Sequence, residues 1–578
     1  MCMDPQQLNQ EAVALLEVGR IPAALNRLQE AVRLAPDDAR HWRAMGNGFK
    51  VARRWPEAIE SLEQAAALDP RSIAARSDLG LLLQHLSQVE PAIHWHGEAL
   101  ALQPDSLVLR LNHAFVLPVV AGSLAEIEAC RGRCEQGLAD LLEDTTVRLD
   151  PGHAVGCHTF SLAYHGRNDR PLLQAYGALL QRHLGGGPQP QRPAGTAAGA
   201  RRPRLGFLSA YFCNHTNGYA FEGLIRGIDR HRFELVLVHV QGGKRDGLSH
   251  RLEAACDRVV TLPRQSAPAR AQLRALELDL LFFTDLGMEA FVTDLACVRS
   301  APVQVSGWGI PHTSGLPLID HYVSSALVEP PEADAHYSET LVRLPGLPCR
   351  YLRGNLADPP EGVHFDRQYF LLPEDDLIVG CLQHPQKLHP DLDAVLEALA
   401  LAVPEALFVV VASEVAEWTQ RFLDRIATTA PALAERVLVL AQMDRTEFMG
   451  LAGCLDLLLD SLHYGSGITM FETAITGTPT VSLEGPLLRS RLVAAAYRQM
   501  GIADAPIASS RQQMVALAAG LLRDGERRRD LAERIRRGAA AHLYDGLEMV
   551  RGFEDFAVEA IARAAGSPPG FRGPAPPR

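Results

Sequence analysis

DSLHYGSGITMFETAITGTPTVSLEG, residues 460–485, runs from an apolar segment through a glycine turn into a predicted helix, and then through Gly477-Thr478-Pro479 into another apolar strand. A strand–turn–helix junction of this kind points backbone N–H groups and the positive end of the helix dipole at one spot. That arrangement favours a bound phosphate. The stretch therefore predicts an α/β region that binds a phosphorylated ligand.

The same alternation of short apolar runs and helical segments extends on both sides of this stretch. The first group of runs, from residue 204, is RLGFLSAYF, FELVLVHV, DRVVTL, LDLLFFTDL and PVQVSGW; the second, after residue 365, is DLIVGCLQ, ALFVVVAS, RVLVLAQ, LDLLLD and TPTVSLEG. Such runs are typical of parallel sheets buried on both faces. We predict two Rossmann-like lobes, residues 204–364 and residues 365–564, the second ending in closing helices. Ligands of open parallel sheets bind at the carboxyl ends of the strands, so the cleft between the lobes is the expected site.

The first 106 residues repeat with a period of 34. The columns that keep this period are Ala12/Gly46/Gly80, Ala24/Ala58/Ala92, Ala31/Ala65/Ala99, Leu34/Leu68/Leu102 and Pro36/Pro70/Pro104. Small residues at fixed helix positions, with a proline after the second helix, are typical of tetratricopeptide helix pairs. Residues 1–106 therefore predict three repeats, whose concave surface would bind a protein or peptide.

Three further segments complete the predicted organisation. Residues 107–184 are expected to form a helical extension, and the Gly/Pro/Arg-rich residues 185–203 a linker. Residues 565–578 are rich in proline and glycine and are predicted to be a disordered tail. The whole chain is therefore expected to be an α-solenoid followed by a two-lobed α/β body.

Composition narrows the classes of partner. The chain has 578 residues, of which 47% are apolar, and a net charge of -12, which argues against a nucleic-acid partner. No apolar run approaches the ~20 residues that span a bilayer, and the N-terminus lacks the pattern of a signal peptide. The ten cysteines form no CxxC pair. A reducing cytoplasm is the expected location.

Four ordered blocks carry a resemblance to a known family. They are LGFLSAYFCNHTNGYAFEGLI, APVQVSGWGIPHTSGLPLIDHYVSS, CLQHPQKLHPDLDAVLEAL and GSGITMFETAITGTPTVSLEGPLLRSR. With the repeats, they resemble the O-linked N-acetylglucosamine transferase/SPINDLY family, and its bacterial branch more closely. The resemblance implies a GT-B fold and an inverting protein glycosyltransferase that moves a sugar, with N-acetylglucosamine expected, from a UDP-sugar to Ser or Thr. Related branches glucosylate Asn or use GDP-fucose, so these donors remain alternatives.

By this resemblance, the opening stretch holds the donor diphosphate and ribose. Gly467, Ile468 and Thr469 would bind the diphosphate, and Glu472 the ribose hydroxyls. The family often has other side chains where this chain has Gly467 and Ile468. Lys387 aligns with a lysine that neutralises the diphosphate, whose charge grows as UDP leaves. No Asp-x-Asp motif stands in a matching place, so neither a metal nor a cofactor beyond the donor is expected.

Residues between these motifs are implied to contact the base. Met443 would bind the edge of the uracil, Arg445 would cover it and Phe448 would stack on it, while Arg491 would face the cleft. Phe448 is equally typical of the core of an amphipathic helix, and Arg491 of a surface arginine.

The first lobe is implied to supply a proton acceptor or a sugar contact. His215 follows the first strand, where it would either hold the sugar, accept the proton of the acceptor hydroxyl, or serve only as a turn residue. His312, Thr313 and Ser314 form a second polar turn and are expected in the sugar or acceptor pocket.

Two other classes of function are alternatives to the transferase. One is a scaffold in which the repeats bind partners and the lobes bind a nucleotide sugar without turnover. The other is a nucleotide-sugar epimerase, which also uses two Rossmann-like lobes. Retention of His215, Lys387, Thr469 and Glu472 favours an enzyme, and the repeats favour a protein substrate.

Overall fold

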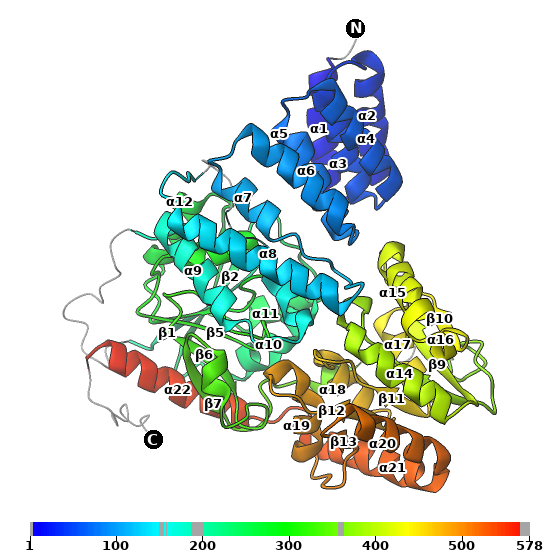
Figure 1. The fold of residues 1–578 in the computed structure, drawn as a ribbon. Coiled ribbons are helices and arrows are strands. Elements are labelled where there is room, and N and C mark those ends of the chain that lie inside the picture. The colour runs from blue at the N-terminus through cyan, green and yellow to red at the C-terminus, as the bar shows by residue number, and fades with distance from the viewer. Residues whose placement is uncertain are drawn as a thin grey trace. The chain divides into compact units, whose positions relative to one another are not determined.

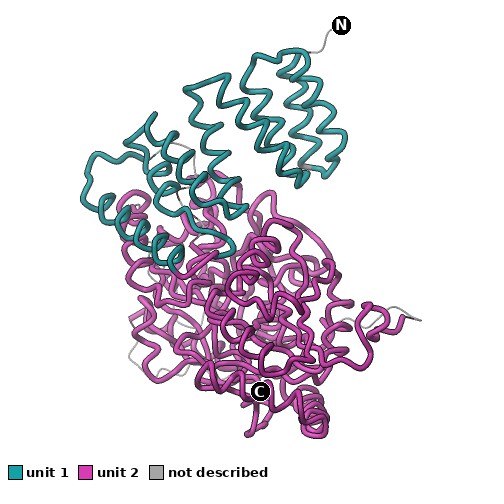
Figure 2. Tube along the Cα trace, turned by 45° about the vertical axis from the view of Figure 1, so that its right-hand side comes forward, with its two compact units in different colours: residues 1–121, 125–153 teal, residues 122–124, 154–578 magenta. Residues whose placement is uncertain are grey.

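The computed structural model describes residues 4–149, 155, 157, 159–186, 201–356 and 363–566. The chain divides into two compact units, drawn in teal and magenta in Figure 2: residues 1–121 with 125–153, and residues 122–124 with 154–578. Most of the predicted linker at 185–203 and of the predicted tail at 565–578 lies outside the described residues.

The first unit begins with three antiparallel helix pairs. Their bounds are α1 (Pro5–Glu17), α2 (Ile21–Leu34), α3 (Ala39–Val51), α4 (Trp55–Leu68), α5 (Ile73–His85) and α6 (Val89–Leu102). Equivalent helices of successive pairs begin 34 residues apart, as the sequence period predicts. Each second helix ends at the periodic leucine, two residues before the periodic proline, which cannot continue a helix.

Small residues set how closely the two helices of a pair approach. A methyl group on Gly46 of α3 would lie 2.7 Å from Leu62 Cγ of α4, and one on Gly80 of α5 would lie 2.8 Å from the His96 ring of α6. Larger side chains at these positions would push the helices apart. The periodic alanines at positions 24, 58 and 92 are likewise fully buried.

The predicted helical extension at 107–184 is divided between the two units, which corrects the expectation of one continuous segment. Helices α7 (Leu107–Ala114) and α8 (Leu124–Glu143) follow the repeats, whereas α9 (Arg170–Leu184) belongs to the second unit. The reason is a close backbone approach. A methyl group on Gly177 of α9 would lie 2.0 Å from the Gly315 carbonyl oxygen, so α9 packs directly on a loop of the first lobe.

The first lobe contains a seven-stranded parallel sheet with the order β3-β2-β1-β4-β5-β6-β7. Its strands are β1 (Arg204–Ser209), β2 (Glu234–Val240), β3 (Arg258–Leu262), β4 (Leu280–Phe283), β5 (Val303–Gly307), β6 (His321–Ser325) and β7 (Thr340–Leu344). The connecting helices are α10 (Thr216–Gly227), α11 (Gly247–Ala254), α12 (Ser266–Ala275) and α13 (Ala290–Ala296). Strands β6 and β7 were not predicted, because polar residues interrupt HYVSS and TLVRL and neither has more than two apolar residues in succession.

The second lobe contains a six-stranded parallel sheet with the order β10-β9-β8-β11-β12-β13. Its strands are β8 (Leu377–Gly380), β9 (Ala406–Val411), β10 (Val437–Leu440), β11 (Leu457–Leu459), β12 (Thr480–Leu483) and β13 (Ile507–Ala508), the last of which was not predicted. Its helices are α14 (Pro390–Ala402), α15 (Ala416–Thr429), α16 (Pro431–Ala434), α17 (Arg445–Cys454), α18 (Ile468–Ala474), α19 (Leu492–Gln499), α20 (Arg511–Arg523) and α21 (Gly525–His542).

The last helix returns to the first lobe, although the sequence had placed it with the second. Helix α22 (Glu548–Ala564) packs against β5 and β7, and it is the red helix near β7 in Figure 1. Glu554 is fully buried and accepts hydrogen bonds from the Asp229 backbone N–H (2.7 Å) and from Arg232 (2.7 Å). A buried carboxylate needs such donors, and here they come from the first lobe.

Each sheet has a switch point, where successive connections leave a central strand in opposite directions. These points lie between β1 and β4 in the first sheet and between β8 and β11 in the second. Ligands of open α/β sheets bind in the crevice outside such points.

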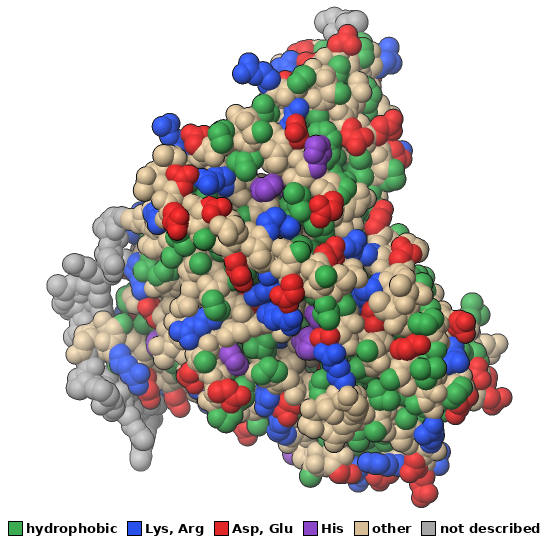
Figure 3. Space-filling view, in the orientation of Figure 1, with side chains coloured by type: hydrophobic (Ala, Val, Ile, Leu, Met, Phe, Trp, Pro, Cys, Tyr) green, Lys and Arg blue, Asp and Glu red, His purple; other side chains and the backbone are tan. Residues whose placement is uncertain are grey.

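The described surface carries charges of both signs. On the face drawn in Figure 3, Lys and Arg side chains are interspersed with Asp and Glu. No helix among the described residues is long and apolar enough to cross a membrane.

Candidate active site

A cavity of about 580 Å³ lies at the carboxyl ends of the strands of both lobes. Most of its lining comes from the segments after β1, β4, β5 and β7 in the first lobe and after β8, β9, β10, β11 and β12 in the second. Six of the predicted site residues line it: His215, Lys387, Phe448, Gly467, Ile468 and Thr469. The structure therefore brings these six residues, one from the first lobe and five from the second, to one cavity.

Lys387 is a half-buried cation beside the glycine turn. Its ammonium donates to Gln383 Oε1 (3.1 Å) and to the Gly465 carbonyl oxygen (3.1 Å), and it lies 4.5 Å from the centre of the Tyr464 ring. Burial lowers the pKa of Lys387 from 10.5 to about 8, while the nearby Asp460 acts in the opposite direction. A cation that is held by neutral oxygens and a ring has charge available for an anionic ligand.

Asp460 shapes the glycine turn that follows β11. Its carboxylate accepts hydrogen bonds from the Ser466 backbone N–H (2.7 Å) and from Ser482 Oγ (2.7 Å). A methyl group on Gly465 would lie only 2.5 Å from Asp460 Oδ2, so the turn requires glycine there. Gln383 reaches across from the loop after β8 and donates to Ser466 Oγ (2.9 Å). The turn is therefore fixed by side chains on both sides of the switch point.

His215 caps helix α10. Its Nδ1 accepts a hydrogen bond from the Asn217 backbone N–H (3.1 Å), and its ring stacks on Tyr211 at a centroid distance of 4.6 Å. Burial lowers the pKa of His215, which favours the neutral ring. Because Nδ1 is an acceptor, the proton of the neutral ring is on Nε2. His215 therefore offers a hydrogen-bond donor through Nε2, not a proton acceptor.

Arg445 and Glu472 contact each other. Arg445 Nε lies 2.6 Å from Glu472 Oε1, and its guanidinium lies 4.4 Å from the centre of the Tyr219 ring of the first lobe. The Tyr351 hydroxyl is bonded to both side chains. Neither residue is among the described lining of the cavity, so the base and ribose roles expected of them stay predictions.

Met443 and Arg491 are also away from the described lining. The Met443 side chain packs against the core of the second lobe, and the neighbouring Gln442 lines the cavity instead. Arg491 joins the lobes: it donates to the Val328 carbonyl (2.7 Å) and pairs with Glu484 (2.7 Å).

His312, Thr313 and Ser314 are buried beside the cavity but do not line it in the described structure. Thr313 Oγ1 donates to Glu339 Oε2 (2.5 Å), and the Ser314 backbone N–H donates to Glu339 Oε1 (2.7 Å). His312 Nδ1 bonds the Thr313 carbonyl (2.7 Å), and burial lowers the pKa of His312. These contacts hold the loop after β5, of which Pro311 reaches the cavity.

The comparisons with known proteins agree with this geometry. Residues 188–349 match the model of glycosyl transferase family 41. The probable UDP-N-acetylglucosamine–peptide N-acetylglucosaminyltransferase SPINDLY of Oryza sativa is 27% identical over 264 residues, which are 45% of this chain and 28% of that protein. The corresponding SEC protein of Arabidopsis thaliana is 21% identical over 377 residues, 63% of this chain and 37% of that protein. The resemblance to the SPINDLY-like transferases is confirmed.

The fold is confirmed over almost the whole chain. A mutant of the Thermobaculum terrenum O-GlcNAc transferase superposes with a TM-score of 0.72 and 22% identity, covering 97% of this chain and 98% of that one. The chain spans about a third of the length of the SPINDLY and SEC proteins it matches, from 28% to 37% for three of them.

Several residues that line the cavity were missed from the sequence. They are Phe160, Tyr164, Asn217, Trp308, Gln383, Gln386 and Tyr464. Gln383, Gln386 and Tyr464 stand inside quoted motifs, so their spacing from Lys387 and Gly465 could have suggested them. Phe160 and Tyr164 come from the 3-10 helix η1 (Thr159–His165), which precedes both lobes, and no pattern in a single sequence points to them.

One group of side chains near the cavity has the composition of a metal site. Ligand atoms of His389, Asp391 and His463 lie within 4.8 Å of one another. However, His463 Nε2 already lies 2.8 Å from Asp391 Oδ2, and the Arg511 guanidinium lies 2.6 Å from the same oxygen. Arginine supplies the positive charge that a metal would otherwise bring, so we assign no metal to this group.

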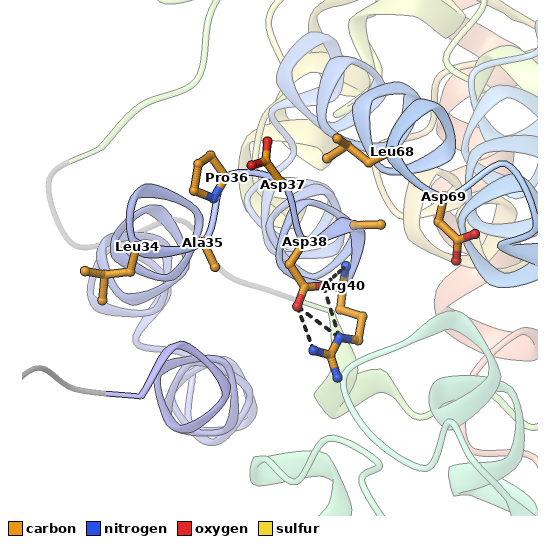
Figure 4. A pocket seen from close by; sticks show the side chains of 9 residues that line it. Leu34, Ala35, Pro36, Asp37, Asp38, Arg40, Leu68 and Asp69 are labelled. Atoms are coloured by element: carbon orange, nitrogen blue, oxygen red, sulfur yellow. Dashed lines mark hydrogen bonds and ion pairs between the residues drawn. The ribbon is translucent and has the colours of Figure 1, made fainter.

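A second hollow, on the repeats, is open and polar (Figure 4). It is lined by Leu34–Arg40, Leu68 and Asp69. Its central carboxylate, Asp38, caps α3 through the Arg40 backbone N–H (2.9 Å) and pairs with the Arg40 guanidinium (2.6 Å). Asp38 is therefore engaged as the N-cap of α3 and as the partner of Arg40, and these contacts account for its place in the hollow without a ligand.

Proposed function

We propose that this chain is an inverting protein glycosyltransferase that moves N-acetylglucosamine from UDP-N-acetylglucosamine to Ser or Thr of a protein. The observation that carries the proposal is Lys387, a half-buried side chain whose ammonium has a pKa lowered to about 8 in a cavity between the switch points of two parallel sheets. The match to family 41 over residues 188–349 supports the class of reaction.

In the proposed reaction, the acceptor hydroxyl oxygen attacks the anomeric carbon as the bond from that carbon to the diphosphate breaks. The electron pair of this bond leaves with UDP, and the hydroxyl proton passes to a base or to solvent. Lys387 would stabilise the charge that grows on the leaving diphosphate. The turn from Gly465 to Thr469 would position the diphosphate beside it, because Gln383 and Asp460 fix that turn.

We assign His215 a binding role in this reaction. Its Nε2–H would donate to an oxygen of the donor or acceptor, since Nδ1 is engaged by the Asn217 N–H. A general base at Nε2 would require the other tautomer and the loss of that cap.

The proposal extends to the protein acceptor, to a reaction without a metal and to a cytoplasmic location. The repeats would present the protein acceptor on their concave surface, because helix pairs of this kind stack into extended binding surfaces. No metal is needed if Lys387 neutralises the diphosphate. A cytoplasmic location is supported by the nine described cysteines, all of which are free thiols.

Thermal unfolding with UDP, GDP, UDP-N-acetylglucosamine, UDP-glucose and GDP-fucose tests the donor. A ligand at 100 times its Kd adds about 2.7 kcal/mol to the free energy of unfolding. We expect stabilisation by the UDP compounds. Stabilisation by the GDP compounds alone would identify GDP, not UDP, as the nucleotide carrier. No stabilisation by any of the five compounds would refute the nucleotide-sugar site.

A further inference from the structure

The short 3-10 helix η1 belongs to neither sheet, yet it supplies part of the cavity wall. Phe160 and Tyr164 of this helix both line the cavity. The Phe160 backbone N–H donates to the Gly287 carbonyl oxygen (3.2 Å) in the loop after β4. The Tyr164 hydroxyl accepts a hydrogen bond from Gln386 Nε2 (3.1 Å), which is adjacent to Lys387 in sequence. One turn of chain is thus attached to both lobes at the cavity.

Three aromatic rings form a continuous wall that starts at the lysine. Tyr464, whose ring lies 4.5 Å from the Lys387 ammonium, is 5.2 Å from the Tyr164 ring, centre to centre. Phe160 completes the group at 5.7 Å from Tyr164 and 6.3 Å from Tyr464. All three side chains keep part of their surface exposed and all three line the cavity. We call Phe160, Tyr164 and Tyr464 the aromatic wall.

The order of groups in a nucleotide sugar determines what would face this wall. With the diphosphate at Lys387, the anomeric carbon comes next, and the substituent at C2 of the sugar is the one closest to the phosphates. The C–H face of a pyranose and the methyl group of an acetamido substituent are apolar and suit aromatic rings. The Gln386 carboxamide, oriented by the Tyr164 hydroxyl, is a polar group at the edge of the same wall.

We propose that Phe160 and Tyr164 are specificity-determining residues for the donor, and that Tyr164 limits the size of the substituent at C2 of the transferred sugar. This inference rests on the proposed function, because it needs the diphosphate at Lys387. It makes the segment between the repeats and the lobes part of the donor site. The Tyr164 ring limits the volume available to the substituent at C2. The Gln386 side-chain amide, oriented by the Tyr164 hydroxyl, would form a hydrogen bond with an acetamido group.

The test compares donors that differ only at C2: UDP-glucose, UDP-N-acetylglucosamine and UDP-N-butanoylglucosamine. Tyr164→Ala should raise kcat/KM for the butanoyl donor relative to the acetyl donor by about tenfold or more, since one methylene in an apolar pocket changes discrimination by about 10–200-fold. Tyr164→Phe keeps the ring but frees Gln386. It should keep the size limit and reduce the preference for UDP-N-acetylglucosamine over UDP-glucose. Tyr369→Ala, on the exposed surface of the second lobe, is the matched control and should change neither ratio.

Stabilisation by UDP alone is measured for every variant, and it separates the two proposals. If the wild type is not stabilised by UDP, the proposed function is wrong. If UDP binds normally and the ratio of butanoyl to acetyl donor is unchanged in Tyr164→Ala, the inference about Tyr164 is wrong. A change confined to the KM of the protein acceptor would also overturn it, because the wall would then contact the acceptor. Tyr164→Leu, which keeps more of the packing, provides the same comparison if the alanine variant does not fold.

Discussion

Replacing Lys387 by methionine should make the protein more stable and much less active. The chain has three lysines, and Lys387 is the one that lines the cavity. Methionine keeps the length of the side chain and its contact with the Tyr464 ring but removes the charge. Lys244→Met is the matched control, because Lys244 lies in an exposed loop.

The stability change follows from the shifted pKa. A pKa lowered from 10.5 to about 8 means that burying the ammonium costs roughly 3 kcal/mol. The folded protein gives up this proton at a lower pH than the unfolded chain does. The cost is therefore complete below pH 8 and disappears as the pH rises from about 8 to 10.5. Lys387→Met should raise the free energy of unfolding at pH 7 by up to this amount, and by little above pH 10.5.

The activity change follows from the charge. Loss of one preorganised electrostatic contact to the leaving group should lower kcat by about 10²–10³. In the wild type, kcat/KM should fall as the pH rises through about 8, because it reports the free enzyme. The decrease of kcat itself should occur at a higher pH, since the bound diphosphate stabilises the charged ammonium of Lys387. In Lys387→Arg, whose guanidinium stays charged, the limb near pH 8 should be absent.

Urea unfolding between pH 7 and 10.5 and donor turnover over the same range measure both effects. Undiminished turnover in Lys387→Met would remove the residue from the leaving-group role. A wild-type limb near pH 8 that persists in Lys387→Arg would assign that titration to another group.

Three other substitutions test the geometry around the cavity. His215→Asn can still cap α10, so it should preserve the melting temperature while lowering turnover by about tenfold or more, because a hydrogen bond to a charged oxygen contributes about 1.5–3 kcal/mol; full activity would show that His215 only caps the helix. Gly465→Ala should weaken stabilisation by UDP, because its methyl group would meet Asp460 at 2.5 Å, and normal UDP binding would exclude the turn as the diphosphate site. Gly520→Ala, its control, lies in open space within α20 and should add about 0.5–1 kcal/mol to stability without changing UDP binding; a loss of stability there would question the helix.

Much of the fold could be predicted because its signals are local. The 34-residue period of alanine, leucine and proline places six helices, and ten apolar runs mark ten of the strands. Strand β6 and strand β7 lack such runs, and their burial depends on α22, which arrives from more than 200 residues later in the chain. The return of α22 to the first lobe is a tertiary contact, secured by Glu554 and Asp229, that no local pattern encodes.

The residues of the candidate site also divide into those that local motifs predict and those that depend on tertiary contacts. His215, Lys387 and Thr469 could be placed at the cavity from the sequence because each stands in a motif within about ten residues of the end of a strand, and strand ends meet at one edge of a parallel sheet. Tyr164 was missed because it reaches the cavity from a segment outside both lobes. His312 and Thr313 were expected in the pocket, but the side chain of Glu339, 26 residues after Thr313, turns Thr313 away into its own hydrogen bonds.

The most direct test of the account is transfer itself. The full chain would be incubated with UDP-N-acetylglucosamine and a mixture of proteins, and both UDP release and the masses of the proteins and their peptides would be followed. The account predicts that Ser or Thr residues gain one N-acetylhexosamine each, in proportion to the UDP released, and that Lys387→Met abolishes most of both. A protein that is stabilised by UDP but modifies no protein in the mixture would contradict the account, and would make this chain a nucleotide-sugar-binding scaffold.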